Sequence, residues 1–162
     1  MKRPGPFIPA VAVLGAVMLL AAASYFSAPA QKGLRLDTLV VEGAAGSRHS
    51  FEVEIADTPQ MQAIGLMFRE RMDPDHGMLF TFAQERVVKF WMKNTPIPLD
   101  MLFIAADGEI KKIHENAVPE SLEGIGSEVP VAGVLEINGG RAKALGIVNG
   151  DKVIHPYFKE TE

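Results

Sequence analysis

The first clear periodic pattern in the chain is an alternation of apolar and polar residues. In Ser50–Ala56 the apolar Phe51, Val53 and Ile55 are separated by glutamates, a period of two that indicates a β-strand with one buried face. The preceding segment, Leu34–Val41, is also rich in β-forming residues, and a Gly-rich stretch separates the two. We therefore expect a β-hairpin with one face exposed to water.

The period then changes from two to that of a helix. Met61, Ile64 and Phe68 recur at helical spacing, and they follow Thr58 and Pro59. Threonine is a good helix N-cap, and proline fits the first helical position because its missing N–H has no partner there anyway. The pattern predicts a short helix.

Two further strand pairs follow. Gly77–Phe82 and Arg86–Met92 are rich in β-formers and only three residues apart, so we expect a second hairpin. Asp100–Ala105 and Glu109–His114 are joined through Asp107–Gly108. Asp-Gly suits a type I′ turn, in which both central residues take positive φ, so a third hairpin is expected here.

The last third of the chain reads as a loop and then short elements. Asn116–Pro130 has little apolar periodicity and is expected to be a long loop, a candidate functional element. We expect a strand at Val131–Ile137, a turn at Asn138–Gly140, at most a short helix at Arg141–Leu145 and a last strand at Lys152–Tyr157. The order predicts an α+β fold: a mostly antiparallel, barrel-like β-sheet domain with one or two short helices.

The N-terminus has the pattern of an export signal. Lys2 and Arg3 precede residues 4–31, which carry no charge. A basic start and an apolar run are typical of a signal peptide, and the small residues at 21–23 or 28–30 offer cleavage sites. The twenty residues 7–26 are also long enough for an uncleaved membrane anchor.

We therefore expect residues 1–30 to be a signal peptide or N-terminal anchor, and residues 31–162 to be one exported domain. The positive charges before the apolar run place the domain on the periplasmic or extracytoplasmic side, anchored to the inner membrane by residues 7–26 if the signal is retained. The membrane is then a partner only through this segment.

Composition narrows the function mainly by exclusion. The 162 residues include no cysteine, which rules out disulfides, thiol nucleophiles and thiolate metal sites. The formal charge is −4 and becomes −6 without Lys2 and Arg3, so nucleic acid is not an expected partner. The four histidines are 27 or more positions apart and form no metal motif. Gly124–Ser127 lacks the lysine of a phosphate loop. No metal and no cofactor is predicted.

The methionines offer a second, weaker possibility. Six lie in the exported domain: Met61, Met67, Met72, Met78, Met92 and Met101. Clustered thioethers bind copper(I), and a methionine-lined pocket accepts varied apolar ligands. Most of these methionines sit inside apolar runs, so we expect them to fill the core.

The segment 90–101 combines an aromatic platform with polar groups. Trp91 is the only tryptophan, and Asn94 and Thr95 follow it before two prolines that stiffen the backbone. Asp100 begins the next strand, and Glu136 lies among apolar residues. A carboxylate in such a setting is either paired or functional. Asp100 and Glu136 form an acid/base pair if their strands are adjacent. Otherwise Asp100 caps a turn and Glu136 pairs with Lys93 or Arg69.

Five motifs occur in an order that closely resembles the DUF192 family. They are GLMFRERM (65–72), GMLFTF (77–82), FWMKNTPIPLDMLFI (90–104), VLEINGG (134–140) and NGDKV (149–153). The resemblance spans Leu36 to Phe158, and the family name records an unknown function. It implies a compact, barrel-like α+β fold. The positions it matches are Arg69, Met78, Trp91, Met92, Asn94, Thr95, Asp100, Glu136, Gly140 and Asp151.

Three functions remain open. The first is a binding module for a small polar ligand, a carbohydrate or a peptide, in a pocket walled by Phe90–Asp100. Its expected ligand-binding residues are Arg69, Met78, Trp91, Asn94, Thr95, Asp100 and Glu136. The second is a hydrolase that uses Asp100 and Glu136, which requires both carboxyl groups in one cavity. The third is an interaction or stability factor for an envelope protein, with a hydrophobic rim around the long loop.

Overall fold

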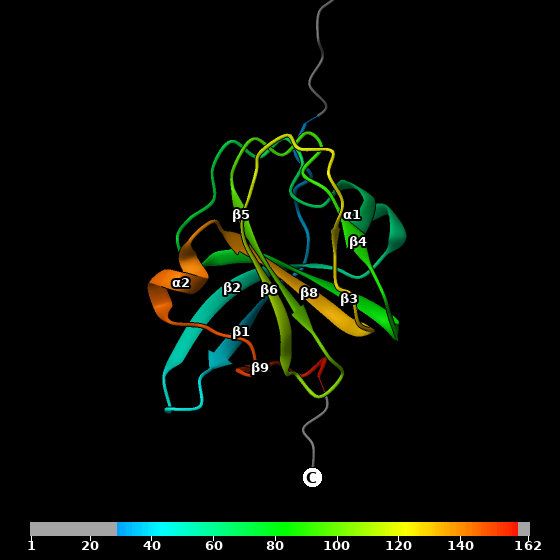
Figure 1. The fold of residues 1–162 in the computed structure, drawn as a ribbon. Coiled ribbons are helices and arrows are strands. Elements are labelled where there is room, and N and C mark those ends of the chain that lie inside the picture. Colours follow the sequence, from blue (N-terminus) through cyan, green and yellow to red (C-terminus); the bar gives the residue numbers. More distant parts are fainter. Residues whose placement is uncertain (1–28, 159–162) are drawn as a thin grey trace, which may run out of the picture.

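A computed structural model of the chain describes residues 29–158 (Figure 1). The expected signal peptide or anchor lies outside the described residues, except for Pro29 and Ala30. Within residues 29–158 no helix is both long enough and apolar enough to cross a membrane.

Seven strands form one curled sheet, in the order β6-β5-β8-β3-β2-β1-β9. Every neighbouring pair is antiparallel except β2 and β3, which are parallel and joined through α1. The strands are β1 (Leu36–Glu42), β2 (Arg48–Ala56), β3 (His76–Arg86), β5 (Leu99–Ile104), β6 (Ile110–Ala117), β8 (Val131–Asn138) and β9 (Lys152–Ile154). Two short strands, β4 (Lys89–Phe90) and β7 (Ile125–Gly126), pair with each other in a separate small sheet.

The two edges of the large sheet meet where β6 begins. Glu109 bridges Lys152, and the N–H of Val153 donates to the carbonyl oxygen of Gly108 at 2.8 Å. Gly108 has φ +83, and a Cβ there would lie 2.5 Å from the Val153 oxygen, so this close approach requires glycine. The sheet therefore closes into a barrel-like shape at this end, and the predicted fold class is confirmed.

Two apolar clusters lie on opposite faces of the sheet. One receives side chains from all seven strands, together with α2 (Arg141–Leu145), and so fills the interior of the curl. The other receives side chains mainly from the central strands β3, β5 and β8. It lies on the outer face, beneath α1 (Pro59–Ile64) and the loops around residues 66, 92 and 125. Strand alternation therefore decides which cluster each side chain enters.

Most local predictions are confirmed, but the loop expected at 116–130 contains β7, the last strand ends at Ile154 rather than Tyr157, and the second hairpin is wrong. Thr58 caps α1, with its Oγ1 accepting from the N–H of Met61 at 3.3 Å. The first and third hairpins form as β1–β2 and β5–β6. The type I′ turn predicted for the third is wrong, because Gly108 has positive φ and Asp107 does not. The second hairpin does not form, because β3 continues through residues 83–86 and β4 pairs with β7. Residues 77–82 are buried on both faces, as suits a central strand, and their partners come from distant segments.

Candidate functional site

A buried glutamate is the unusual group on the outer face. Glu136 lies on β8 between two fully buried methionines, opposite Met78 of β3 and Met101 of β5. Its side chain is 4% exposed, and no hydrogen-bond partner of its carboxyl group is found among residues 29–158. Burial raises the pKa of Glu136 from its ordinary value of 4.5 to about 8. The carboxyl group is therefore mostly protonated at neutral pH and can donate a hydrogen bond.

Glu136 faces a small cavity beneath α1. The cavity measures about 40 Å³, enough for one water-sized group. Trp91 and Thr95 line it together with Glu136, and Phe80, Phe90 and Leu99 form apolar walls; residues 62–67 of α1 and the following turn complete the lining. A hydrogen-bonding atom placed here meets one acidic proton in apolar surroundings.

Trp91 stands where this cavity adjoins a larger open groove of about 530 Å³. The indole is 49% exposed, and the Lys93 ammonium lies 5.2 Å from its ring centroid. The neighbouring Phe90 points inward instead, with edge contacts to Phe80 and Phe103 at centroid distances of 5.0 and 6.3 Å. Phe90 thus anchors the segment, and Trp91 remains available for stacking.

The loops that cover the site contain strained residues. Phe68, Asn94 and Glu120 have φ values of +64, +54 and +61, a backbone conformation that residues other than glycine rarely adopt. Hydrogen bonds hold them: the N–H of Phe68 donates to the carbonyl oxygen of Asn94 at 2.7 Å, and that of Glu120 to Thr95 at 3.1 Å. Such strain is typical of binding and catalytic sites.

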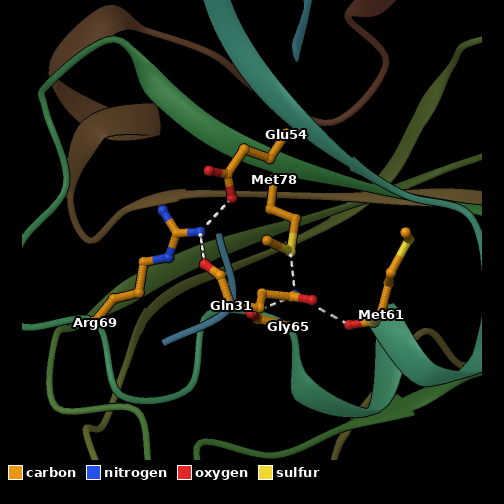
Figure 2. Close-up of polar contacts among 6 residues, drawn as sticks. All are labelled: Gln31, Glu54, Met61, Gly65, Arg69 and Met78. Carbon is orange, nitrogen blue, oxygen red and sulfur yellow. Dashed lines mark hydrogen bonds and ion pairs between the residues drawn. The ribbon is translucent and has the colours of Figure 1, made fainter. Parts of the chain in front are cut away.

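Beside this site the N-terminal segment crosses the outer face (Figure 2). The Gln31 side-chain amide donates to the carbonyl oxygens of Met61 (3.1 Å) and Gly65 (2.8 Å) and lies 3.9 Å from the Met78 sulfur. Arg69 donates to the Gln31 carbonyl oxygen at 3.0 Å and forms an ion pair with Glu54. Gln31 therefore ties the end of α1 to the sheet, next to the cavity.

Asp100 lies on the other face. The register pairs Met101, not Asp100, with Glu136, and adjacent residues of a strand point to opposite faces. The fully buried Asp100 carboxylate accepts backbone N–H bonds from Asn116, Gly140 and Ala142, each at 2.8 Å. The two carboxyl groups do not share a cavity, so the geometry required for a two-carboxylate hydrolase is absent.

The structure brings some of the predicted site residues together and separates others. Trp91, Thr95 and Glu136 line one cavity. Met78 pairs with Glu136, and the Asn94 amide lies 3.9 Å from the sulfur of the cavity-lining Met67. Arg69 belongs to the neighbouring network, where its partner is Glu54 and not Glu136.

Sequence reasoning missed the contributions of α1 and of the N-terminal segment. Gln62 and Gly65 line the cavity, and Gln31 fixes the turn that contains Gly65. Gln31 carries no signal in the sequence, because it precedes the first periodic segment. The turn was open to prediction, since the GLMFRERM motif begins at Gly65.

The outer face also collects the methionines. Met78, Met92 and Met101 are fully buried in the outer cluster, Met61 and Met72 pack against it, and Met67 lines the cavity. Gap filling in the core accounts for the buried ones. In the part of the chain that the structure describes, no group of three His, Asp or Glu side chains is placed to hold a metal ion.

Comparisons with known proteins point to one family. The profile of DUF192, described as an uncharacterized ACR, matches residues 40–155. A crystal structure from Sinorhizobium meliloti 1021, described provisionally as a transcription regulator, is 49% identical over 76% of this chain and 96% of that chain, with a TM-score of 0.75. A protein of unknown function from Novosphingobium aromaticivorans DSM 12444 is 43% identical, covering 76% and 88%, with a TM-score of 0.74. No curated protein matches the sequence.

Proposed function

Because the chain belongs to the DUF192 family, whose description assigns no reaction, its function has to be argued from its site, and we propose that it is an exported binding module. The ligand is a small polar molecule, a carbohydrate or a peptide. It places an apolar face on Trp91 and a hydrogen-bond acceptor in the cavity at Glu136. The negative charge of residues 31–162 disfavours the nucleic-acid partner that a transcription regulator needs.

The observation that supports this proposal is the unpartnered carboxyl group of Glu136. A carboxyl group that faces a cavity and that no side chain or backbone group of residues 29–158 engages is a candidate for ligand binding. A ligand carbonyl or hydroxyl oxygen that accepts the Glu136 proton supplies the hydrogen bond that the protein does not. The adjoining groove, of about 530 Å³, has the size of an ordinary ligand pocket.

Fluorescence of Trp91, the only tryptophan, tests the proposal. The full-length chain, purified in a nonionic detergent, is titrated with mono- and disaccharides and with acetylated di- and tripeptides. We expect at least one of these compounds to shift the Trp91 emission saturably and to raise the melting temperature. If none of them does either, the binding module is refuted for both ligand classes.

Two substitutions of similar volume test whether Glu136 donates a hydrogen bond to the ligand. Glu136→Gln keeps a hydrogen-bond donor, whereas Glu136→Met does not. For the compound that binds, we expect Glu136→Gln to retain most of the affinity and Glu136→Met to weaken it about tenfold, as suits one lost hydrogen bond. Equal affinities for the two variants would exclude Glu136 from the site.

A second candidate is the envelope interaction factor. It is favoured by Val118 and Leu122, which are 67% and 69% exposed in the loop between β6 and β7. Replacing both with serine is expected to leave ligand binding at Trp91 unchanged and to abolish any protein complex that the loop supports. Co-purification from the envelope fraction with and without the double substitution separates the two candidates.

A further inference from the structure

The larger groove runs along the free edge of a strand. Its walls are α1, through Pro59, Gln62 and Ala63, and the segment from Arg86 to Trp91, which contains β4. No residue of β7, the partner of β4, lines it. The groove therefore lies on the side of β4 that β7 leaves open, in a sheet of only two strands.

Backbone hydrogen bonds fix which groups of β4 face this side. Val88 donates its N–H to the Ser127 hydroxyl at 3.1 Å and accepts from the Ser127 N–H at 3.0 Å. Backbone groups of successive residues in an extended strand point to opposite edges. The N–H and C=O of Lys89 consequently point toward the groove, where an added strand finds one donor and one acceptor.

The charges in the groove are of one sign. Arg86 and Lys89 are among the lining residues, and no Asp or Glu is; the outer end of the Lys89 side chain packs over Gly124, beside β7, so Arg86 is the cation that the groove offers. Neither cation has an ion-pair partner among residues 29–158. The Arg86 guanidinium carbon lies 4.7 Å from the centroid of the Phe82 ring, so stacking holds the group in place. A planar guanidinium held in this way is suited to a carboxylate, which it binds through two parallel hydrogen bonds.

We infer that this groove binds an extended peptide that pairs with the backbone of Lys89 and presents a carboxylate to Arg86. Strand addition at a free edge supplies affinity through main-chain bonds, and the flanking side chains select the sequence. The exposed Trp91 and the 61% exposed Val87 supply an apolar surface for a neighbouring side chain. The inference rests on the proposed function, because it names the ligand class of the same site.

Four tetrapeptides test the inference on the full-length chain in detergent. The parent probe is acetyl-Ala-Phe-Ala-Glu with a free C-terminus. The second replaces Glu with Gln and amidates the C-terminus, the third N-methylates the central amides, and the fourth carries the parent composition in scrambled order. Binding is followed by Trp91 fluorescence at low and high salt, and for Arg86→Gln, Lys89→Gln and the remote surface control Lys143→Gln.

We expect the parent to bind at least tenfold more tightly than the neutral peptide at low salt, with the difference shrinking at high salt. Arg86→Gln should weaken parent binding threefold to tenfold, whereas Lys89→Gln, whose side chain packs over Gly124, and the remote Lys143→Gln should not. N-methylation should weaken it at least tenfold, because the strand pairing is lost. The scrambled peptide should keep the charge effect and lose the contact with Trp91.

Equal binding of the acidic and neutral peptides, or no effect of Arg86→Gln, overturns the inference. Binding of a saccharide in a manner that depends on Glu136, with no peptide bound, also overturns it and leaves the proposed function standing. Failure of every compound to perturb Trp91 or the melting temperature refutes both.

Discussion

Two carboxyl groups are buried on neighbouring strands of the same sheet, and the protein treats them in opposite ways. Asp100 faces the interior and accepts three backbone N–H bonds. Glu136 faces the outer cluster, next to a cavity, and has no hydrogen-bond partner within residues 29–158. Burial alone does not distinguish a structural acid from a functional one. The number of donors arranged around each acid does.

The largest effect on stability is expected for Asp100, whose carboxylate has its hydrogen-bond donors in place. Asp100→Ala leaves three N–H groups without their acceptor, and each unpaired donor costs about 1 to 3 kcal/mol. We expect the free energy of unfolding to fall by about 3 to 5 kcal/mol, as measured by urea denaturation. Asp100→Asn, which keeps one oxygen acceptor, should lose less. A small loss for Asp100→Ala combined with abolished ligand binding would place Asp100 in the binding site instead.

The pH dependence of stability sharpens the comparison on the Glu136 side. Because burial raises its pKa to about 8, the folded protein keeps a proton that the unfolded chain releases above about pH 4.5. Stability from this group is therefore fully present at low pH and is lost as pH rises to about 8. We expect Glu136→Gln to equal the wild type near pH 5 and to exceed it by a few kcal/mol near pH 9.

Urea midpoints at intervals from pH 5 to pH 9 provide that measurement, and the difference between the two proteins removes the contribution of other titrating groups. Parallel curves for the wild type and Glu136→Gln would mean that Glu136 is ionised and partnered in the folded protein.

A smaller effect on stability is expected from Gln31, whose side chain lies beside Glu136 on the same face. Gln31→Ala removes two hydrogen bonds to carbonyl oxygens at the end of α1. We expect stability to fall by about 1 to 2 kcal/mol and amide hydrogen exchange in α1 to accelerate. The exposed neighbour Lys32 supplies the control, since Lys32→Ala should change neither. Unchanged exchange in Gln31→Ala would show that other contacts hold α1, among them the Gln62 amide, which donates to the carbonyl oxygens of Ala56 and Thr81.

The smallest effect is expected at Trp91. Its half-exposed ring contributes little to the core, so Trp91→Phe should change stability by no more than about 0.5 kcal/mol. Acrylamide should quench native Trp91 efficiently, and quenching should drop when a ligand occupies the groove. If truncation of Trp91 lowered the free energy of unfolding by several kcal/mol, as it does for a buried aromatic residue, Trp91 would be a core residue and not a binding surface.

Local chemistry explains which parts of the fold are predictable from the sequence. The Asp107–Gly108 pair marks the position of the β5–β6 turn, although only Gly108 takes positive φ. Thr58 and Pro59 mark the start of α1. The antiparallel partner of β3 is β8, whose paired residues are 45 to 60 positions further along the chain, and no turn residue reports such a pairing. A short spacing between two β-rich segments therefore suggested a hairpin that does not form.

The candidate site was also predictable only in part. Strand alternation was enough to mark Glu136 as a carboxylate among apolar neighbours. The relation of Glu136 to Asp100 depends on the register between β5 and β8, which opposes Met101 to Glu136. A shift of one residue would turn Asp100 to the outer face. Register is set by packing across the whole sheet, so a single sequence leaves this relation open.

The bridge that closes the sheet also governs how the chain folds. β1 and β9 are the first and last strands, more than one hundred residues apart, and they pair directly. Folding dominated by such distant contacts is slow, on the order of milliseconds to seconds. A chain that stops before Lys152 leaves the edge of β1 and the start of β6 unpaired, where strands of other molecules add. The last strand therefore protects the finished molecule from aggregation.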